Sequence, residues 1–560
     1  MSSWLNIETH IQASVSNTQS QHPQVEGIFT SKELSTMSEV FDVIVVGGGH
    51  NGLTTAGYIA KAGKSVLVLE SKAYLGGGVA TKEITLPGFK HDLHSSAHLG
   101  ILLNPLIAND ELQLKSKYGL EYIRPNAAYS TTFTDGSCLI GYNDLERTID
   151  NIAEVASKKD ADAYYQLYKE SMEFVPMAMH GLFSPPPPYG AFIAMLDQSP
   201  MGRNALHEIQ NSPLGILTER FESDKLKIHM LRLLTEHFVD PEARGEGGAL
   251  FMYPAFFEKY GFQTPRGGSG GLVDAMVRQL EDHGAELRCN STVTKILTSG
   301  GKAVGVRLAD GTEIRAKEAV VGQIHPFNLQ KMVDDVLDEQ VVREIKRAET
   351  SSFSCVTAHY ALDTPPSYVH PDINDSWLNG LCPTSLDDFK NVVYDVRNGR
   401  IPKTPSMGTI ATHHVDPSRA PEGKSTFLVW RIMPYKLADG STWADRKAEV
   451  EEETLNMVDS FLPGLKSSVL AKAFDTPDDI AAYSPTFQRG DVSGLAAPLF
   501  QSQGHRPTPS LSQYTVPGVQ GLYLSGVFMH PTAGGVCGGG RVTALKLFED
   551  KGWDFDKVTS

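Results

Sequence analysis

The sequence predicts an α/β fold whose nucleotide-binding sheet is assembled from separate parts of the chain. Three observations lead to this prediction. Residues 41–70 form a strand, a glycine-rich turn, a helix and a second strand; residues 265–325 contain a helix followed by strands; and residues 521–550 again read as strand, glycine-rich loop and helix. Two long segments separate these units, and we expect them to fold as insertions.

The first unit carries Gly47, Gly49 and Gly52 in the spacing G-x-G-x-x-G. A short apolar run precedes the glycines, a helical pattern follows them, and Glu70 ends the next apolar strand. Such glycines permit a tight turn and a close approach to a pyrophosphate, and the helix N-terminus attracts the phosphates. A terminal acid accepts hydrogen bonds from a ribose 2′-hydroxyl. The unit therefore predicts dinucleotide binding, with FAD or NAD favoured over NADP.

The other two units follow the same pattern. Gly76 and Gly77 open a second glycine cluster after the second strand, and residues 269–283 have a helical pattern that stops at a glycine. Turn signals at 299–301 and 310–311 divide the following segment into strands. We therefore predict a discontinuous nucleotide-binding domain, with an inserted domain and lid. Its segments are residues 39–100, 262–325 and 511–560; the inserted segments are residues 101–261 and 326–510; residues 1–38 form a flexible N-terminal tail.

Composition narrows the class of protein. The 560-residue chain has a formal net charge of −16, which argues against nucleic acid and against electrostatic docking on anionic lipid. Its 5 cysteines include no C-x-x-C pair, so neither a zinc site nor a redox dithiol is expected. Residues 1–38 lack the features of a secretory signal. A cytoplasmic location is the expectation, with an organelle or peripheral contact with a membrane as alternatives.

Several motifs resemble one family. The opening motif, the paired glycines at 76–77, PRGGSGGLVDAMVRQL at 265–280 and GLYLSGVFMHPTAGGVCG at 521–538 are similar to those of the phytoene desaturase-type flavoproteins. That family includes carotenoid desaturases, β-carotene ketolases, carotenoid isomerases and the pyridine nucleotide-disulfide oxidoreductase domain-containing protein 2 branch. The resemblance implies a glutathione reductase-like Rossmann domain that binds FAD non-covalently, with an inserted α+β substrate domain.

The resemblance also implies roles for individual positions. Glu70 would contact the adenosine ribose, Val293 would hold adenine through its backbone, and Gly526 would neighbour the ribityl phosphate. The pyrophosphate, the flavin edge and the pyrimidine end of the flavin would be approached by a set of small residues: Gly47, Gly49, Gly52, Gly76, Gly77, Gly534, Gly535 and Val536. A helix N-terminus near the last three would stabilise negative charge on the reduced flavin.

Two histidines are the candidates for catalysis. His94 lies in the loop after the second glycine cluster, and His530 lies in the C-terminal glycine-rich loop. We expect the two loops to meet at the flavin, where an imidazole with a pKa near neutrality suits proton transfer. The neighbouring histidines 91 and 98 share no spacing that places three rings on one face, so no metal site is predicted.

These features predict an FAD-dependent oxidoreductase of the desaturase, dehydrogenase or oxidase type, with hydride transfer to flavin N5. Its expected substrate is a hydrophobic small molecule, unsaturated or isoprenoid-like. A non-redox isomerase or hydratase that uses reduced FAD, and a non-catalytic flavoprotein scaffold, stay open as alternatives. The sequence has no second complete G-x-G-x-x-G unit, so oxygen or a quinone is expected to reoxidise the flavin, and NAD(P)H is not expected to be obligatory. The sequence does not predict the oligomeric state.

Overall fold

Two β-sheets organise the part of the chain that the structure describes. The computed structural model describes residues 39–99, 101–251, 254, 259–334, 336–532 and 536–560. Both sheets belong to one compact unit, residues 40–560. Among the described residues, no helix has the length and apolar character needed to cross a bilayer.

The first sheet has the strand order β10-β11-β19-β12-β1-β2-β9, with β18 paired to β19. Its strands are β1 (Val40–Val46), β2 (Val66–Leu69), β9 (Glu286–Arg288), β10 (Val293–Ser299), β11 (Lys302–Leu308), β12 (Glu313–Gly322), β18 (Thr515–Val516) and β19 (Val519–Leu524). Strand β1 pairs in parallel with β2 and β12, and β12 pairs in parallel with β19. Strands from all three predicted units therefore lie in one sheet.

Helices cover both faces of the first sheet. On β1, Val43 and Val45 pack with α1 (His50–Lys61), α10 (Gly270–Asp282) and α17 (Gly538–Lys551), whereas Ile44 packs in a separate core with α11 (Pro326–Met332) and α12 (Glu339–Ile345). Because successive side chains of a strand point to opposite faces, a strand buried on both faces must be apolar throughout. This explains the apolar run at residues 43–46 of β1. Each fully buried Val or Ile contributes about 1.5–3 kcal/mol.

The second sheet has the order β17-β13-β16-β15-β14-β6-β7. Its strands are β6 (Ala127–Phe133), β7 (Cys138–Tyr142), β13 (Ser354–Leu362), β14 (Ser376–Cys382), β15 (Met407–Ala411), β16 (Ser425–Met433) and β17 (Val469–Asp475). All of its pairings are antiparallel except β14 with β6. On β13, Val356, Ala358 and Tyr360 pack in one core with α14 (Trp443–Phe461), and Cys355 belongs to the core on the other face.

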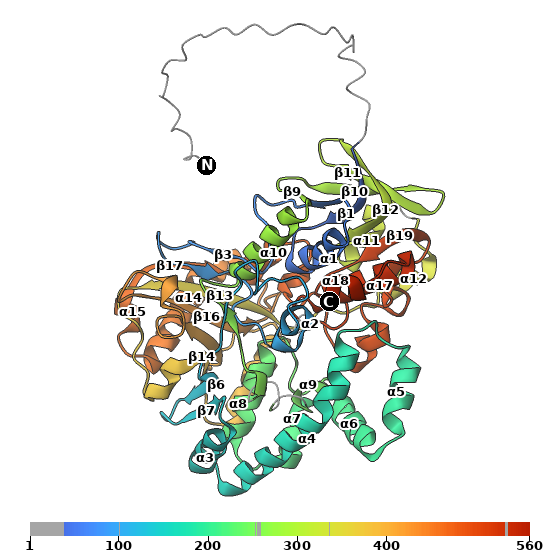
Figure 1. Ribbon diagram of the computed structural model, residues 1–560. Helices are drawn as coiled ribbons and strands as arrows, with labels where there is room; N and C mark the ends of the chain where they lie inside the picture. Colours follow the sequence, from blue (N-terminus) through green and yellow to red (C-terminus); the bar gives the residue numbers. More distant parts are fainter. Residues whose placement is uncertain (1–38, 100, 252–253, 255–258, 335, 533–535) are drawn as a thin grey trace, which may run out of the picture. The chain divides into compact units, whose positions relative to one another are not determined.

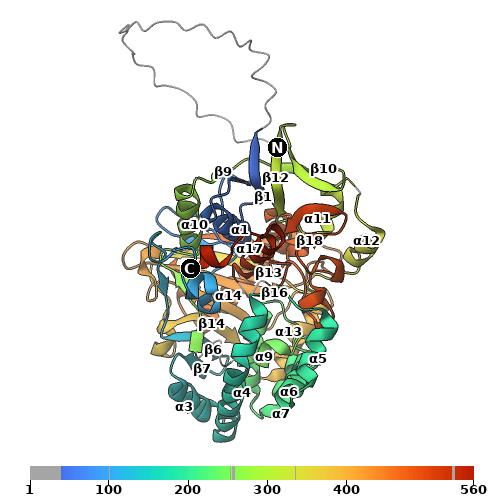
Figure 2. The same cartoon turned by 45° about the vertical axis from the view of Figure 1, so that its right-hand side comes forward.

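A group of helices lies beside the second sheet (Figures 1 and 2). Its members are α3 (Leu145–Val155), α4 (Lys158–Leu182), α5 (Tyr189–Asp197), α6 (Pro200–Gln210), α7 (Pro213–Arg220), α8 (Asp224–Thr235) and α9 (Gly248–Phe251). Helices α4, α6, α7 and α8 each begin after a serine whose side chain accepts a first-turn N–H. Such a cap contributes about 1 kcal/mol, so local sequence sets these helix starts.

Shorter elements complete the described chain. The short strands are β3 (Thr81–Lys82), β4 (His91–Asp92), β5 (Tyr122–Ile123) and β8 (Thr264–Pro265). The remaining α-helices are α2 (Pro105–Ala108), α13 (Leu386–Arg397), α15 (Leu465–Ser468), α16 (Pro477–Tyr483) and α18 (Asp556–Thr559). Strands β3 and β4 form a hairpin. This hairpin leads from the second glycine cluster to the loop at residues 91–98, which we call the histidine loop.

Candidate functional site

The first glycine-rich loop connects β1 to α1. Gly47 has a φ of +99°, a left-handed conformation that favours glycine. The N–H of Gly48 donates to Glu70 Oε2 at 2.8 Å, and the N–H of Lys72 donates to Glu70 Oε1 at 2.8 Å. The loop therefore holds the Glu70 carboxylate beside its own backbone, at the end of β2.

The second glycine cluster lies directly against the first. The N–H of Gly76 donates to the carbonyl of Gly48 at 2.8 Å, and Gly76 forms a bridge with Gly49. A Cβ on Gly77 would lie 3.1 Å from the Cα of Gly49, so a side chain there would press the two loops apart. Four glycines thus bring main-chain groups of the two loops together where the sequence predicts a pyrophosphate.

Two helix N-termini adjoin these loops. Helix α1 begins after Gly49 with no side-chain cap and no acid in its first turn, so its first N–H groups remain available to an anion. Asn51 on this helix accepts a hydrogen bond from the N–H of Gly540 at 2.9 Å. The first turn of α17 is therefore fastened to α1. The backbone cradle, the uncapped α1 and Glu70 together fit the phosphates and ribose of a dinucleotide.

Gln323 is a component of this region that the sequence did not indicate. It follows β12, and its side-chain Nε2 donates to the carbonyls of Gly47 and Gly49. A Cβ on Gly52 would overlap both Gln323 Nε2 and the carbonyl oxygen of Gly47. The third glycine of the motif is therefore required by the fold itself, because helix, loop and Gln323 meet at that position. Only the tertiary arrangement reveals this contact.

The other predicted FAD contacts lie near the same strands. Val293 begins β10, and the N–H of Ser291, two residues earlier, bonds to the carbonyl of Glu70 at 2.8 Å. Gly526 follows β19, and a Cβ on Gly539 would lie 2.8 Å from the carbonyl of Gly526. The carbonyl of Val536 accepts a hydrogen bond from Asn104.

Helix α17 starts at Gly538, slightly later than the sequence suggested. Gly534 and Gly535 lie outside the described residues, so the predicted flavin contacts of this pair stay predictions.

The histidine loop is fastened by a buried ion network. Arg419 donates to Asp92 at 2.7 Å and to Asp416 at 3.2 Å, and all three side chains are at most 2% exposed. Asp92 also accepts from Thr81 and from the N–H of Ser269, which precedes α10. The network therefore joins the loop after the second glycine cluster, the start of α10 and an inserted segment. A single guanidinium compensates two buried carboxylates there.

His94 and His530 occupy different surroundings. The His94 ring stands edge-on to Tyr483 and Phe487, with centroid distances of 4.2 and 5.1 Å. His530 Nε2 donates to the carbonyl of Gly181 at 2.8 Å, at the end of α4. In the described chain these two histidines share no contact, so the structure does not bring their rings together. The expected meeting of the two loops at a flavin stays a prediction.

Burial changes the expected acid–base behaviour of the histidines. Desolvation lowers the pKa of His94 to about 3 and the pKa of His530 to about 4. Desolvation also lowers the pKa of His91 and of His98 to about 3. The expectation of a pKa near neutrality is therefore wrong for this structure, because burial disfavours the charged imidazolium. As a consequence, these rings are neutral at pH 7. A neutral imidazole still has one N–H donor and one acceptor.

An apolar face of the second sheet lies beside the histidine loop. Leu428 and Trp430 of β16 and Ile410 of β15 belong to or pack against one core with Phe487 and with Leu99, just after the histidine loop. This core extends to α4, α7 and α8. Among the described residues, no group of three or more His, Cys, Asp or Glu side chains has a metal-binding arrangement. The region around the histidine loop thus combines a large apolar core with neutral imidazoles.

Comparisons with known proteins agree with this arrangement. The sequence profile of a family described as flavin containing amine oxidoreductase matches residues 52–546. The chain is 29% identical to pyridine nucleotide-disulfide oxidoreductase domain-containing protein 2 of Mus musculus, with 91% of this chain and 94% of that protein covered. It is 27% identical to one of the limonene dehydrogenase polypeptides of Castellaniella defragrans, with 92% and 96% covered.

Two further similarities complete the picture. The chain is 25% identical to the neurosporene-forming phytoene desaturase of Rhodobacter capsulatus, with 90% of this chain and 93% of that protein covered. Among solved structures, cyclohexylamine oxidase from Brevibacterium oxydans matches with a TM-score of 0.56 at 16% identity, covering 91% of this chain and 99% of the other. At that identity the match supports the fold alone, which is mixed α/β.

Proposed function

Because this chain belongs to the flavin-containing amine oxidoreductase family, we propose that it oxidises an apolar, unsaturated or isoprenoid-like molecule rather than an amine. The relatives confirm the resemblance to phytoene desaturase-type flavoproteins. The chain is an FAD-dependent oxidoreductase, as the sequence predicted. Its mixed α/β fold is likewise as expected.

We propose that FAD lies across the two glycine-rich loops. The N-terminal amides of α1 and the glycines at 47, 49, 52, 76 and 77 would hold the pyrophosphate, Glu70 would hold the ribose, and Val293 would hold the adenine. Gly526 and the start of α17 would approach the flavin, together with Gly534, Gly535 and Val536. When bound, FAD supplies a two-electron acceptor. The domain would be glutathione reductase-like.

The division of labour between the sheets is also a proposal. Residues 39–100, 262–325 and 511–560 would bind the cofactor, because the first sheet draws its strands from these three segments. Residues 101–261 and 326–510 would supply the substrate surface, because the second sheet and the helices beside it come from these two segments.

The observation that carries the substrate class is the chemistry of the region around the histidine loop. Leu428, Trp430 and Ile410 lie in or against the apolar core there, and burial keeps His94 neutral. The carboxylate of Asp92, which could otherwise attract an ammonium group, is paired with Arg419, which it shares with Asp416. A hydrocarbon would gain about 25 cal/mol for each Å² of apolar surface buried in these surroundings. The names of the limonene- and phytoene-acting relatives point the same way.

Anaerobic mixing tests this proposal. Protein loaded with FAD is mixed with phytoene or limonene in detergent, and the oxidised flavin absorbance near its visible maximum is followed. Bleaching with a hydrocarbon, and none with an alkylamine such as cyclohexylamine, is the expected result. Turnover only after prior reduction of the flavin would favour a non-redox isomerase or hydratase instead. Bleaching by the amine alone would refute the proposed substrate class.

The electron acceptor is a separate proposal. A complete G-x-G-x-x-G motif occurs once in the chain, at 47–52, and no C-x-x-C dithiol is present, so we propose oxygen or a quinone as the acceptor. NADH and NADPH are expected to reduce the flavin slowly or not at all without substrate. Rapid stoichiometric reduction by micromolar NADPH in a stopped-flow experiment would contradict this.

A further inference from the structure

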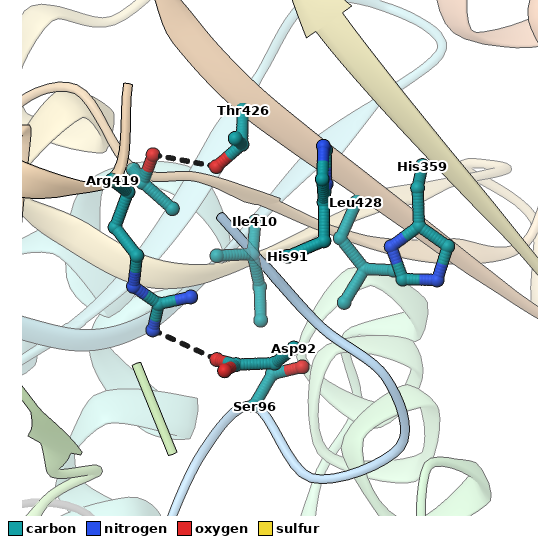
Figure 3. A pocket seen from close by; sticks show the side chains of 9 residues that line it. His91, Asp92, Ser96, His359, Ile410, Arg419, Thr426 and Leu428 are labelled. Carbon is teal, nitrogen blue, oxygen red and sulfur yellow. Dashed lines mark hydrogen bonds and ion pairs between the residues drawn. The ribbon is translucent and has the colours of Figure 1, made fainter. Parts of the chain in front are cut away.

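A small cavity lies between the histidine loop and the second sheet (Figure 3). Its lining comes from the loop, from β13, from β15 and the residue after it, from β16, and from Arg419. The residues are His91, Asp92, Ser96, His359, Ile410, Thr412, Arg419, Thr426 and Leu428. In the view of Figure 3, Arg419 and His359 lie on opposite sides of this group, with Ile410 and Leu428 between them.

His359 is the unusual member of this lining. Its side chain on β13 is 1% exposed, and neither Nδ1 nor Nε2 has a hydrogen-bond partner. Its ring stands edge-on to His91 with a centroid distance of 5.4 Å, and this contact gives neither ring nitrogen a hydrogen-bond partner. Leaving a buried polar group unpaired costs about 1–3 kcal/mol. An arrangement with two such atoms is expected to persist only where a ligand completes it.

Most other polar groups on the lining already have partners. The hydroxyls of Thr412 and Thr426 bond to each other at 2.8 Å, and Arg419 is engaged by Asp92, Asp416 and Thr264. An ordered water in a protein interior usually needs two to four polar partners. An oxygen atom carried by an apolar molecule needs only one, because the rest of that molecule is held by apolar contacts.

The size of the cavity indicates what fits. It offers about 10 Å³ to the centre of a water-sized sphere, which is roughly the minimum for a single oxygen atom. A chain of methylene groups or a ring is too large for it. Ile410 and Leu428, on the same lining, continue into the apolar core beside the loop. A polar subsite of one atom is therefore contiguous with the apolar core beside the histidine loop.

We propose that His359 binds a single carbonyl or hydroxyl oxygen of an otherwise apolar substrate, so that the enzyme recognises oxygenated isoprenoid-like molecules. This inference rests on the proposed apolar substrate class and narrows it. A neutral imidazole donates one N–H to a carbonyl, and it can also accept from a hydroxyl. Desolvation lowers the pKa of His359 to about 4, which keeps the ring in this form at pH 7.

The test uses two probes of one carbon skeleton. Geranylacetone is an isoprenoid ketone, and 2,6-dimethylundeca-2,6-diene is the same chain without the oxygen. Each is titrated into FAD-loaded protein in the same detergent, and the dissociation constant is taken from the change in the flavin spectrum. The quantity of interest is the ratio of the two constants, because detergent partitioning of each probe is the same for all variants.

Three proteins are compared: the native chain, His359→Leu and His359→Gln. We expect His359→Leu to shift the ratio about tenfold in favour of the hydrocarbon, and His359→Gln, which keeps an N–H donor, to restore at least part of the preference for the ketone. Full FAD content and a melting temperature that is not lowered exclude a folding defect. As a second control, Leu470→Met, at an exposed position on β17, should leave the ratio unchanged.

Two outcomes distinguish a failure of the role of His359 from a failure of the proposed substrate class. A ratio that His359→Leu does not change would overturn the role of His359. Failure of both probes to perturb the flavin in the native protein, even at saturation of the detergent, would count against the proposed apolar substrate class itself.

Discussion

The glycine-rich region around Gly47 and Gly76 and the histidine region around His94 and His359 are built in opposite ways. The first presents main-chain groups from two adjacent loops and the uncapped start of α1. The second presents side chains, gathered from the histidine loop, from β13, β15 and β16 and from Arg419. Backbone cradles suit a cofactor that many proteins share, whereas side chains are free to vary with the substrate.

The same difference appears in the electrostatics. Helix N-termini and amide groups make the glycine-rich region attractive to phosphate. In the histidine region, charge is either paired, as in the Arg419 network, or suppressed by burial, as in the imidazoles. The proposed anionic cofactor and the proposed neutral, apolar substrate would therefore be held by different kinds of group.

The largest expected effect is acid unfolding. His91, His94, His98 and His359 have pKa values lowered to about 3–4 by burial. In the unfolded chain a histidine titrates near 6.5, so the unfolded state takes up protons first. Stability is therefore complete above pH 6.5 and is lost as the pH falls toward 4. At pH 5.5 the four rings together cost on the order of 5 kcal/mol. Urea unfolding at pH 7.5 and 5.5 measures this, and equal midpoints would contradict it.

Removing the charge of Arg419 should have the next largest effect. Arg419→Met leaves Asp92 and Asp416 as unpaired buried carboxylates, which should lower the free energy of unfolding by about 3–5 kcal/mol. Arg266→Met is the matched control, because its ion pair with Glu121 is half exposed, and it should leave the midpoint unchanged. Similar midpoints for the two variants in denaturant titrations would show that the network does not stabilise the histidine loop.

Two glycine substitutions probe the other region. Gly49→Leu places a side chain against Gln323, in the loop where the pyrophosphate is expected, and should weaken FAD binding at least a hundredfold, or about 2.7 kcal/mol. Gly52→Ala should instead lower the melting temperature of the FAD-free protein, because its Cβ overlaps the carbonyl of Gly47. Flavin titration and thermal melts distinguish the two effects. Normal FAD uptake by Gly49→Leu would mean that the cofactor does not cross this loop.

The smallest expected effect concerns turnover. His94→Ala and His530→Ala should retain FAD and lower turnover by at least about tenfold, or ~1.4 kcal/mol of barrier. Because both rings are neutral at pH 7, turnover should not follow a titration near pH 6.5. His207→Ala, at an exposed position on α6, is the control. Turnover by both variants at the native rate would remove them from the catalytic site.

The sequence predicted the glycine-rich region well because its signals are local. Strand, glycines, helix and Glu70 follow one another along 41–70, so their spacing alone predicts their geometry. Gln323 and Asn51 escaped notice because each acts on a partner hundreds of residues away. The sequence also showed no sign of the environment of His359, because long-range packing creates it. The same kind of packing lowers the pKa of His94, which we expected near neutrality. Burial of a side chain is a property of the whole fold.

We propose that the glycine-rich region and the histidine region form one site, joined by the flavin. A crystal structure of the FAD-loaded protein tests it by the distances from flavin N5 to the imidazoles of His94 and His530. We expect phosphate oxygens within hydrogen-bond distance of the first N–H groups of α1. We also expect at least one of the two rings within about 10 Å of N5, near enough to act through substrate or one bridging water. Both rings farther than about 10 Å from N5 would contradict it.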